Sequence, residues 1–414
     1  MGMRLKDGID QIAETGRVDR VVLRSVVLAA LINSLGYMDR VSMSIVAPSL
    51  RAEFSFSAVQ IGMIFGAFSL SYALFQTPWG MVADRWPVRN LVAFVILLWS
   101  ASTGLTALCS TFIVFLLVRF VFGVSEAALS PMIAALFRRS VSSEWRPVAF
   151  GLFLAGGRIG GLVAPAITAF YVVHDGWRSV FLFFAALGVI AVIGWWIGYP
   201  RGELVERREP DEIRGRFPIS ISLLILILVA FLYTLTWQFF ATWFPTYLIE
   251  SRHFSLQRAS VFTGLPFFFG VFSSFGGGPL SRWSARVFGT RVGRRIVVSG
   301  SLAASGGLFL CGVLVPSDHG SAILISLAAA AGDLVLSTLW ASAVELGRGA
   351  AGAVAGLMNA TANLGAFLSP LLVGKMLESG AGWTHILETG ALINIAAAIL
   401  WIFFRTEDQA SLTK

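Results

Sequence analysis

The sequence predicts an all-α membrane protein in which twelve transmembrane helices form two pseudo-symmetric six-helix bundles. Three observations predict this fold. The 414 residues are 56% hydrophobic and 13% charged, with a mean hydropathy of +0.78, whereas a soluble domain carries roughly 25% charged residues. Uncharged runs long enough for a spanning helix, ~20 residues, recur along the whole chain. The two halves also share motifs in the same order.

The uncharged runs set the approximate bounds of the spans. Charged residues collect between them in short tracts such as 201–216 and 282–295. The predicted spans are 21–49, 57–79, 90–109, 112–136, 147–171, 178–199, 218–248, 259–279, 295–315, 320–343, 350–374 and 385–404.

The distribution of basic residues predicts the orientation. Twelve spans place both termini on one side, and 23 of the 31 Lys and Arg residues then lie on that side, with 5 on the other and 3 inside spans. Cytoplasmic loops are enriched in Lys and Arg, so we expect both termini in the cytoplasm. The net charge of +8 therefore indicates basic loops and no nucleic-acid partner. Residues 1–20 are polar and predict no cleaved signal peptide.

Three motifs recur in both halves. The loop motif at 80–86 returns at 277–283, 197 residues later, and the glycine-rich span at 151–165 returns at 356–370, 205 residues later. A Gly-Trp pair at 176 returns 206 residues later. Carriers are often built from two such repeats, with the binding site between them near the middle of the bilayer.

The repeats predict the domain organisation. Residues 1–200 form an N-terminal six-helix bundle and residues 218–414 a C-terminal one. The polar tract 201–217 is predicted to be a cytoplasmic linker between them.

Enzymes and primary pumps are excluded by what the sequence lacks. The four histidines fall near span ends or in outer loops without a metal-ligand spacing, and there is no GxxxxGK[ST] phosphate loop. We expect neither catalysis nor a cofactor.

The loop from Gly80 to Arg89 resembles the signature of the major facilitator superfamily, with departures at Pro87 and Val88. Within that superfamily the chain resembles the anion:cation symporter branch, which includes bacterial sugar-acid carriers. The residues that carry this resemblance are Tyr37–Arg40, Arg119–Glu126 and Thr242–Leu248.

The resemblance implies the major facilitator fold and alternating access, with uptake of a small organic anion driven by a proton gradient. A sugar acid such as an aldonate, uronate or aldarate is the expected substrate. We expect a monomer within the lipid bilayer of a bacterial inner membrane. Asp84, Arg85 and Arg89 are expected to form a cytoplasmic gate; the alternative, which is compatible with a gate, is that they act as topology determinants only.

Six ionisable residues lie inside the predicted spans. A charge at the bilayer centre costs at least ~2.5–3.5 kcal/mol, so each needs a partner or a function. These residues are Asp39, Arg40, Arg119, Glu126, Arg158 and Asp333.

Arg119 and Glu126 are seven residues apart and therefore share one helix face, ~10 Å apart along the axis. That separation is too long for a direct ion pair, so each either faces a central cavity or pairs with a neighbouring helix. Asp39 and Arg40 point ~100° apart. We expect Arg40 toward the cavity and Asp39 toward another helix; the alternative is a helix-end pair at the outer interface.

Arginine suits carboxylates because its planar fork makes bidentate hydrogen bonds and stays charged. An anion bound on Arg119 would weaken the electrostatic attraction between that guanidinium and the Glu126 carboxylate. Protonation of Glu126 would then be favoured, so substrate and proton would assist each other's binding. The resemblance assigns proton-coupling roles to Glu126 and Asp39 and a binding role to Arg40, and a cavity lined by Arg40 and Arg119 is expected to select anions.

Further contacts are expected around the substrate. The resemblance places Tyr72, Ser337, Trp340 and Asn359 there, and Asn363 lies one turn beyond Asn359; packing or interface anchoring is the alternative for the two aromatic residues. Arg158 either binds a second carboxylate or pairs with Asp333 or Glu126. Asp333 is a counter-ion or a second proton site.

A different kind of carrier is the main alternative. A proton-driven exporter of drugs or metabolites would share the Gly/Pro pattern of 151–165, although paired arginines oppose cationic drugs. A non-transporting sensor is a third reading.

Overall fold

A computed structural model describes the backbone of residues 2–83, 86–141, 145–199, 219–347 and 350–405, and the side chains from residue 22 onward except that of residue 147. Within these ranges the chain contains helices and no strands. The predicted gate residues Asp84 and Arg85, and the predicted linker 201–217, lie outside the described residues. The bundle boundaries therefore stay a prediction.

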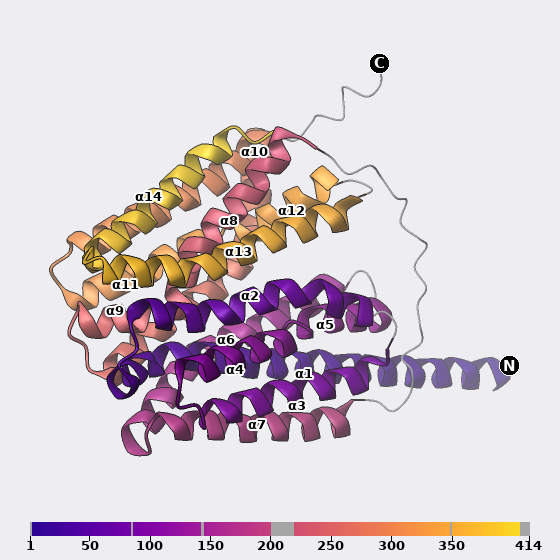
Figure 1. The fold of residues 1–414 in the computed structure, drawn as a ribbon. Coiled ribbons are helices and arrows are strands. Elements are labelled where there is room, and N and C mark those ends of the chain that lie inside the picture. The colour runs from indigo at the N-terminus through magenta and orange to yellow at the C-terminus, as the bar shows by residue number, and fades with distance from the viewer. Residues whose placement is uncertain (1, 84–85, 142–144, 200–218, 348–349, 406–414) are drawn as a thin grey trace.

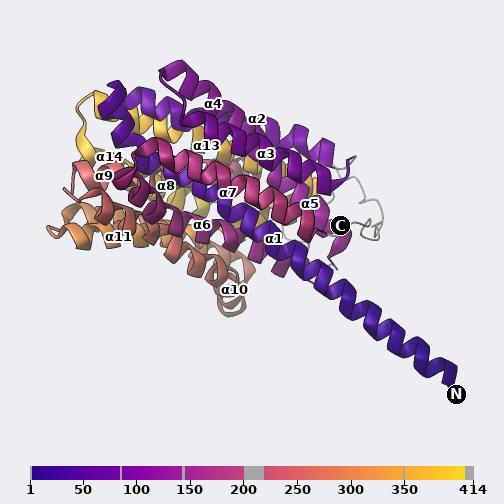
Figure 2. The ribbon, with the colours of Figure 1, turned by 90° about the horizontal axis from the view of Figure 1, so that it is seen from below.

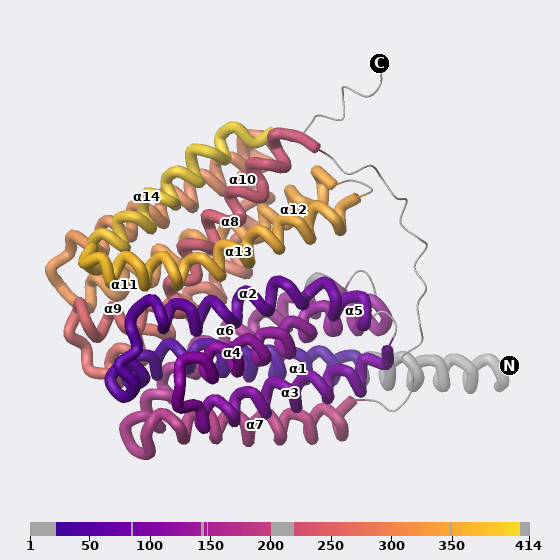
Figure 3. Tube along the Cα trace, in the orientation of Figure 1, coloured from indigo at the N-terminus to yellow at the C-terminus, as the bar shows by residue number. Residues whose placement is uncertain are grey.

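The helices form two bundles, one below the other in Figure 1 and in the tube of Figure 3. The first contains α1 (Gly2–Phe54), α2 (Ala58–Ala83), α3 (Val88–Thr106), α4 (Phe112–Glu126), α5 (Leu129–Ser140), α6 (Arg146–His174) and α7 (Trp177–Gly198). The second contains α8 (Ile221–Thr242), α9 (Phe244–Glu250), α10 (Leu256–Leu314), α11 (Asp318–Asp333), α12 (Leu336–Gly347), α13 (Ala351–Glu378) and α14 (Gly382–Ile402).

Eleven described segments are long and apolar enough to cross a membrane. One of them, α10, has 59 residues and would extend roughly 90 Å if straight, about three bilayer cores. It turns at Gly289, where φ is 78° and ψ is 157°, a conformation that only glycine adopts readily. It therefore contains both predicted spans 259–279 and 295–315, and the predicted twelve-span all-α fold is confirmed.

Many large apolar side chains remain on the outside of the bundle. Ile190, Ile197 and Ile221 are 61%, 79% and 77% exposed, as a lipid-facing surface requires. Seen from below, α1, α3 and α7 cross the molecule side by side (Figure 2).

Two spans are broken at matching places. The fourth span divides after Glu126, the last residue of α4, and α5 resumes at Leu129. The tenth span divides after Asp333, the last residue of α11, and α12 resumes at Leu336. The two acids are 207 residues apart (333 minus 126), close to the repeat of the flanking motifs, so they hold equivalent positions in the two halves.

The predicted span 218–248 is also interrupted. Helix α8 ends at Thr242 and α9 begins at Phe244, with Pro245 in its first turn. Proline lacks the N–H that a continuous helix needs and fits only the start of a new one. The predicted continuous span 218–248 is therefore wrong at this point.

We call the end of the bundle at which α1 stops and α2 starts the far end; the opposite end carries the first turns of α1 and the last turn of α14 (Figure 1). At the far end the two bundles touch directly. Arg51 of α1 and Glu250 of α9 form an ion pair at 2.5 Å, and the Val59 N–H donates to Oε1 of Glu378 at 2.9 Å.

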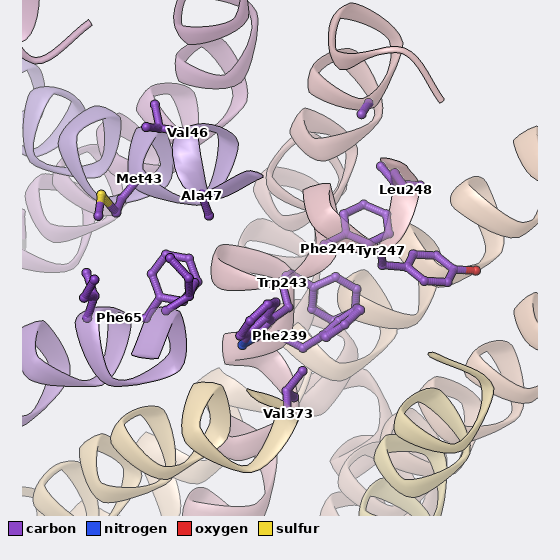
Figure 4. Packing of buried hydrophobic residues seen from close by; sticks show 14 of the residues in the cluster. Met43, Val46, Ala47, Phe65, Phe239, Trp243, Phe244, Tyr247, Leu248 and Val373 are labelled. Atoms are coloured by element: carbon purple, nitrogen blue, oxygen red, sulfur yellow. The ribbon is translucent and has the colours of Figure 1, made fainter. Parts of the chain in front are cut away.

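A buried apolar cluster continues this contact between the bundles. Met43 and Phe65 of the first bundle lie opposite Phe239 and Trp243 of the second (Figure 4). The Phe65 and Trp243 rings meet edge to face with centroids 5.7 Å apart. The far end is therefore closed by packing as well as by charge.

Candidate functional site

A cavity of about 50 Å³, partly open, lies between the two bundles. Pockets for small molecules are typically about 300–1,000 Å³, so the bundles enclose only a narrow space in this conformation. Helices α1, α2 and α4 supply one wall, and α8 and α10 the other. The lining residues are Tyr37, Arg40, Val41, Phe65, Phe68, Arg119, Trp237, Gln238, Ala241, Thr242 and Phe267.

Arg40 lies at the centre of this wall, and its Nε donates to Oε1 of Glu126 at 2.8 Å. The Glu126 side chain is 1% exposed and that of Arg40 is 23% exposed, so the arginine alone can reach a molecule in the cavity. The guanidinium carbon lies 4.9, 4.9 and 4.8 Å from the ring centroids of Tyr37, Phe68 and Tyr72. Such ring contacts stabilise a cation.

Arg119 reaches the same cavity from α4. It is 3% exposed, its guanidinium carbon lies 4.9 Å from the Phe122 ring centroid, and its Nε has no hydrogen-bond partner among the described residues. An unpaired buried donor is costly. The cavity therefore offers a desolvated positive group that an anion can satisfy.

Asp39 is 2% exposed and is not among the lining residues. Neither of its carboxylate oxygens makes a hydrogen bond of normal geometry within the described part of the chain, although the Thr103 hydroxyl lies close to it. It lies within electrostatic range of Arg119 and Glu126. The structure thus separates Asp39 from Arg40 as their spacing on the helix predicts.

A second ion pair joins the two bundles. Arg158 of α6 and Asp333 of α11 lie 2.7 Å apart, with side chains 12% and 1% exposed. The Tyr233 hydroxyl donates a short hydrogen bond to Asp333, and the Trp237 ring lies 5.0 Å from the Arg158 guanidinium carbon. Of the alternatives that the sequence left open for Arg158, the structure forms the pair with Asp333.

Glycine makes this approach possible. A Cβ placed on Gly270 of α10 would lie 2.9 Å from Oδ2 of Asp333 and 3.0 Å from Nη1 of Arg158. Both contacts are tighter than real Cβ atoms normally make, so a larger residue here would require the two charged side chains to shift.

The other predicted substrate contacts lie on three helices. Tyr72 stacks on Arg40, and its hydroxyl is 3.4 Å from Oγ of Ser130. Ser337 has a buried hydroxyl without a partner among the described residues. Trp340 is 41% exposed and is not among the cavity-lining residues.

The two asparagines of α13 are engaged within the protein. Asn359 donates to Oε1 of Gln76 at 2.7 Å, across the two bundles, and Asn363 donates to the Asn359 carbonyl at 2.9 Å. Their amide groups are therefore shared with protein partners.

Arg89, the one predicted gate residue within the described ranges, contacts α7. It donates to the Trp196 carbonyl at 2.8 Å and lies over the Trp196 ring at 4.3 Å.

Sequence reasoning missed the wall contributed by α8 and α10, which includes Trp237, Gln238 and Phe267. One signal was available. Trp237 follows Arg40 by 197 residues, which is the offset of the repeated loop motif. Trp237 is therefore the repeat counterpart of Arg40, and it could have been predicted to line the cavity from the second bundle.

Comparison with known proteins agrees with this architecture. The family model described as Major Facilitator Superfamily matches residues 29–370. The probable sulfoacetate transporter SauU of Cupriavidus necator is 28% identical over 410 residues, covering 91% of this chain and 93% of that protein. The hexuronate transporter of Bacillus subtilis is 27% identical over 395 residues, with 91% and 93% covered.

A third relative, the probable L-galactonate transporter of Escherichia coli, is 24% identical over 418 residues, covering 96% and 92% of the two chains. Among solved structures, a bacterial homolog of the human lysosomal transporter Spinster, inward-facing and occupied, matches with a TM-score of 0.78 at 19% identity, over 92% of this chain and 96% of that one. That likeness shows the fold.

Proposed function

We propose that this chain, which belongs to the Major Facilitator Superfamily, is a proton-coupled symporter that takes up a small organic anion, a sugar acid such as an aldonate, uronate or aldarate. The observation that carries the proposal is the pair formed by Arg40 and Glu126 beside the central cavity. It places a group able to bind a carboxylate in contact with a group able to carry a proton. Relatives described as transporters of sulfoacetate, hexuronate and L-galactonate support the substrate class.

Charge balance gives the reason for coupling. Arg40, Arg119 and Arg158 are matched by Asp39, Glu126 and Asp333 within the described spans, so an empty site with every group ionised is neutral. An anion that enters adds a negative charge inside a medium that penalises net charge. One proton taken up by a carboxyl group removes that charge.

The contact between Arg40 and Glu126 supplies the route. A substrate carboxylate that binds Arg40 and Arg119 competes with Glu126 for the Arg40 guanidinium. Glu126 then loses its counter-ion and accepts a proton, and the protonated carboxyl group in turn leaves Arg40 free for substrate. Each ligand strengthens the binding of the other by the same factor. Asp39, buried near Arg119, is the second proposed proton carrier.

Alternating access requires the closed far end to open. With both termini in the cytoplasm, as the basic loops favour, the far end faces outward and the cavity is reached from the cytoplasm. Opening of the far end would break the contact between Arg51 and Glu250. Asp84, Arg85 and Arg89 would then close the cytoplasmic end of the bundle.

Binding and flux measurements test this function together. The purified protein is titrated with aldonates, uronates and aldarates in a thermal-shift assay, with neutral sugars and cationic drugs as controls. Reconstituted vesicles then report uptake with and without an imposed proton gradient. We expect stabilisation by acids alone and accumulation only with the gradient. Stabilisation by cationic drugs alone would instead identify an exporter.

A further inference from the structure

The two halves of the site are more alike than the cavity lining suggests. Glu126 and Asp333 each end a helix, and in each case the span breaks and resumes three residues later. Each acid is about 1% exposed in its side chain and each contacts one arginine, at 2.8 Å and 2.7 Å. The carboxylate–arginine pair is therefore repeated in the second bundle.

The two pairs differ in where the arginine comes from. Arg40 and Glu126 both belong to the first bundle. Asp333 belongs to the second bundle, and its arginine, Arg158, crosses over from the first. Trp237 holds the position that matches Arg40 and packs its ring on Arg158 at 5.0 Å.

The second pair adjoins the same cavity. Trp237 lines the cavity together with Arg40 and Arg119, and its ring also lies over the Arg158 guanidinium and edge-on to the Phe267 ring. Nη1 of Arg158 is buried and has no hydrogen-bond partner among the described residues, and Nε1 of Trp237 makes no hydrogen bond of normal geometry, although it lies near the Asp333 carboxylate. Buried donors of this kind call for an acceptor.

We propose that Arg158 and Trp237 form a second anion subsite and that Asp333 occupies it when no substrate is bound. The substrate is then a short dianion, with an acidic group at each end, and its second acidic group replaces Asp333 on Arg158. This inference rests on the proposed function, because the first acidic group binds Arg40 and Arg119.

Asp333 keeps a hydrogen-bond partner when the substrate replaces it on Arg158. Tyr233 donates to its other oxygen, Oδ1, so the carboxyl group keeps one hydrogen bond after it leaves Arg158. The exchange swaps one carboxylate for another on the same guanidinium, and the displaced Asp333 carboxylate takes up a second proton, which removes the second charge that a dianion brings. A monoanion lacks the group that makes this exchange.

Matched pairs of anions test the inference with the purified full-length protein. D-glucarate is compared with D-gluconate, and sulfoacetate with isethionate, because each pair differs by a carboxylate in place of a hydroxymethyl group. In at least one pair we expect the dianion to bind about tenfold more tightly or better, the value of one charge-assisted hydrogen bond. Equal binding within both pairs overturns the inference.

Variants identify the residues responsible. The neutral double variant Arg158→Gln with Asp333→Asn avoids a buried unpaired charge, and we expect it to lose the dianion preference while keeping monoanion binding. Asp333→Asn alone removes the competitor and should tighten dianion binding. Glu345→Gln, which alters the exposed ion pair with Arg294 in the same bundle, is the control and should leave the preference unchanged. A preference that survives in the double variant contradicts the inference.

The failure of this inference is distinguishable from that of the proposed function. If both members of each pair bind equally, and gluconate or a uronate is carried in a way that Arg119→Lys abolishes, the proposed function stands and the dianion subsite alone is wrong. If neither class of anion binds, both are wrong.

Discussion

Nε of Arg40 donates to Oε1 of Glu126 across α1 and α4, at 2.8 Å, beside a cavity that Arg40 lines and Glu126 does not. The arginine is thus shared between the solvent-accessible site and a carboxyl group buried behind it. Any anion that binds Arg40 therefore competes directly with Glu126 for the Arg40 guanidinium. This relationship makes the coupling mechanism testable by single substitutions.

Glu126→Gln should keep substrate exchange and lose uphill accumulation. The amide still occupies the space beside Arg40 but cannot gain or lose a proton, so binding is uncoupled from the gradient. Counterflow of radiolabelled substrate in vesicles measures exchange, and uptake under an imposed proton gradient measures accumulation. Accumulation to the wild-type level would show that Glu126 does not carry the coupled proton; Glu345→Gln is the matched control.

Arg119→Lys should abolish transport. An ammonium group keeps the charge but not the planar pair of donors that fits a carboxylate. Loss of one charge-assisted hydrogen bond costs ~1.5–3 kcal/mol, or roughly a 10- to 150-fold weaker binding constant. Substrate titration of the purified variant measures this loss directly. Wild-type uptake by the variant would contradict bidentate binding at Arg119.

Gly160→Ala should destabilise the first bundle. A Cβ at this position of α6 would lie 2.0 Å from the Ser34 carbonyl oxygen on α1, so the two helices must move apart. Overpacking of this kind costs ~1–3 kcal/mol.

Gly151→Ala, in the same helix, is the matched control for that substitution. Nothing lies within 4 Å of its added Cβ, and alanine is the better helix former by roughly 0.5–1 kcal/mol. Thermal unfolding followed by tryptophan fluorescence should give a lower midpoint for the first variant and an equal or higher one for the second. Equal midpoints would mean that α1 and α6 pack less closely than the structure shows.

Crosslinking the far end should stop transport without preventing binding. Arg51→Cys and Glu250→Cys place two thiols where the bundles meet through a 2.5 Å ion pair, in a background with Cys109→Ser and Cys311→Ser. A short bifunctional thiol reagent then holds the far end closed. Anion binding should persist in the thermal-shift assay while vesicle uptake falls to background.

A crosslink within one bundle controls for the reagent. Arg178 and Glu53 form an ion pair at 2.8 Å, also at the far end but both in the first bundle, so joining cysteines there should leave uptake intact. Uptake that continues through the Arg51–Glu250 crosslink would show that the far end does not need to open.

The sequence by itself determined the membrane architecture. A chain with 13% charged residues has too little polar surface for water, and the free energy of burying uncharged runs in lipid fixes where the helices lie. The same reasoning identified Arg40, Arg119 and Arg158 as residues that cannot face lipid, because a charge there is too costly. Local properties of this kind depend only on consecutive residues, so the sequence is enough to predict them.

Only the tertiary structure decided which charge meets which. Helix periodicity excluded a direct pair between Arg119 and Glu126, but the partner of Glu126 depends on the depth and rotation of α1 against α4. The partner of Arg158 depends on how the two bundles dock. The helix ends at Glu126 and Asp333 could not be predicted either. The surrounding sequence is apolar throughout, and a continuous helix and a broken one would bury the same side chains. Pairing is a property of the packed bundle, since it joins residues that the sequence keeps far apart.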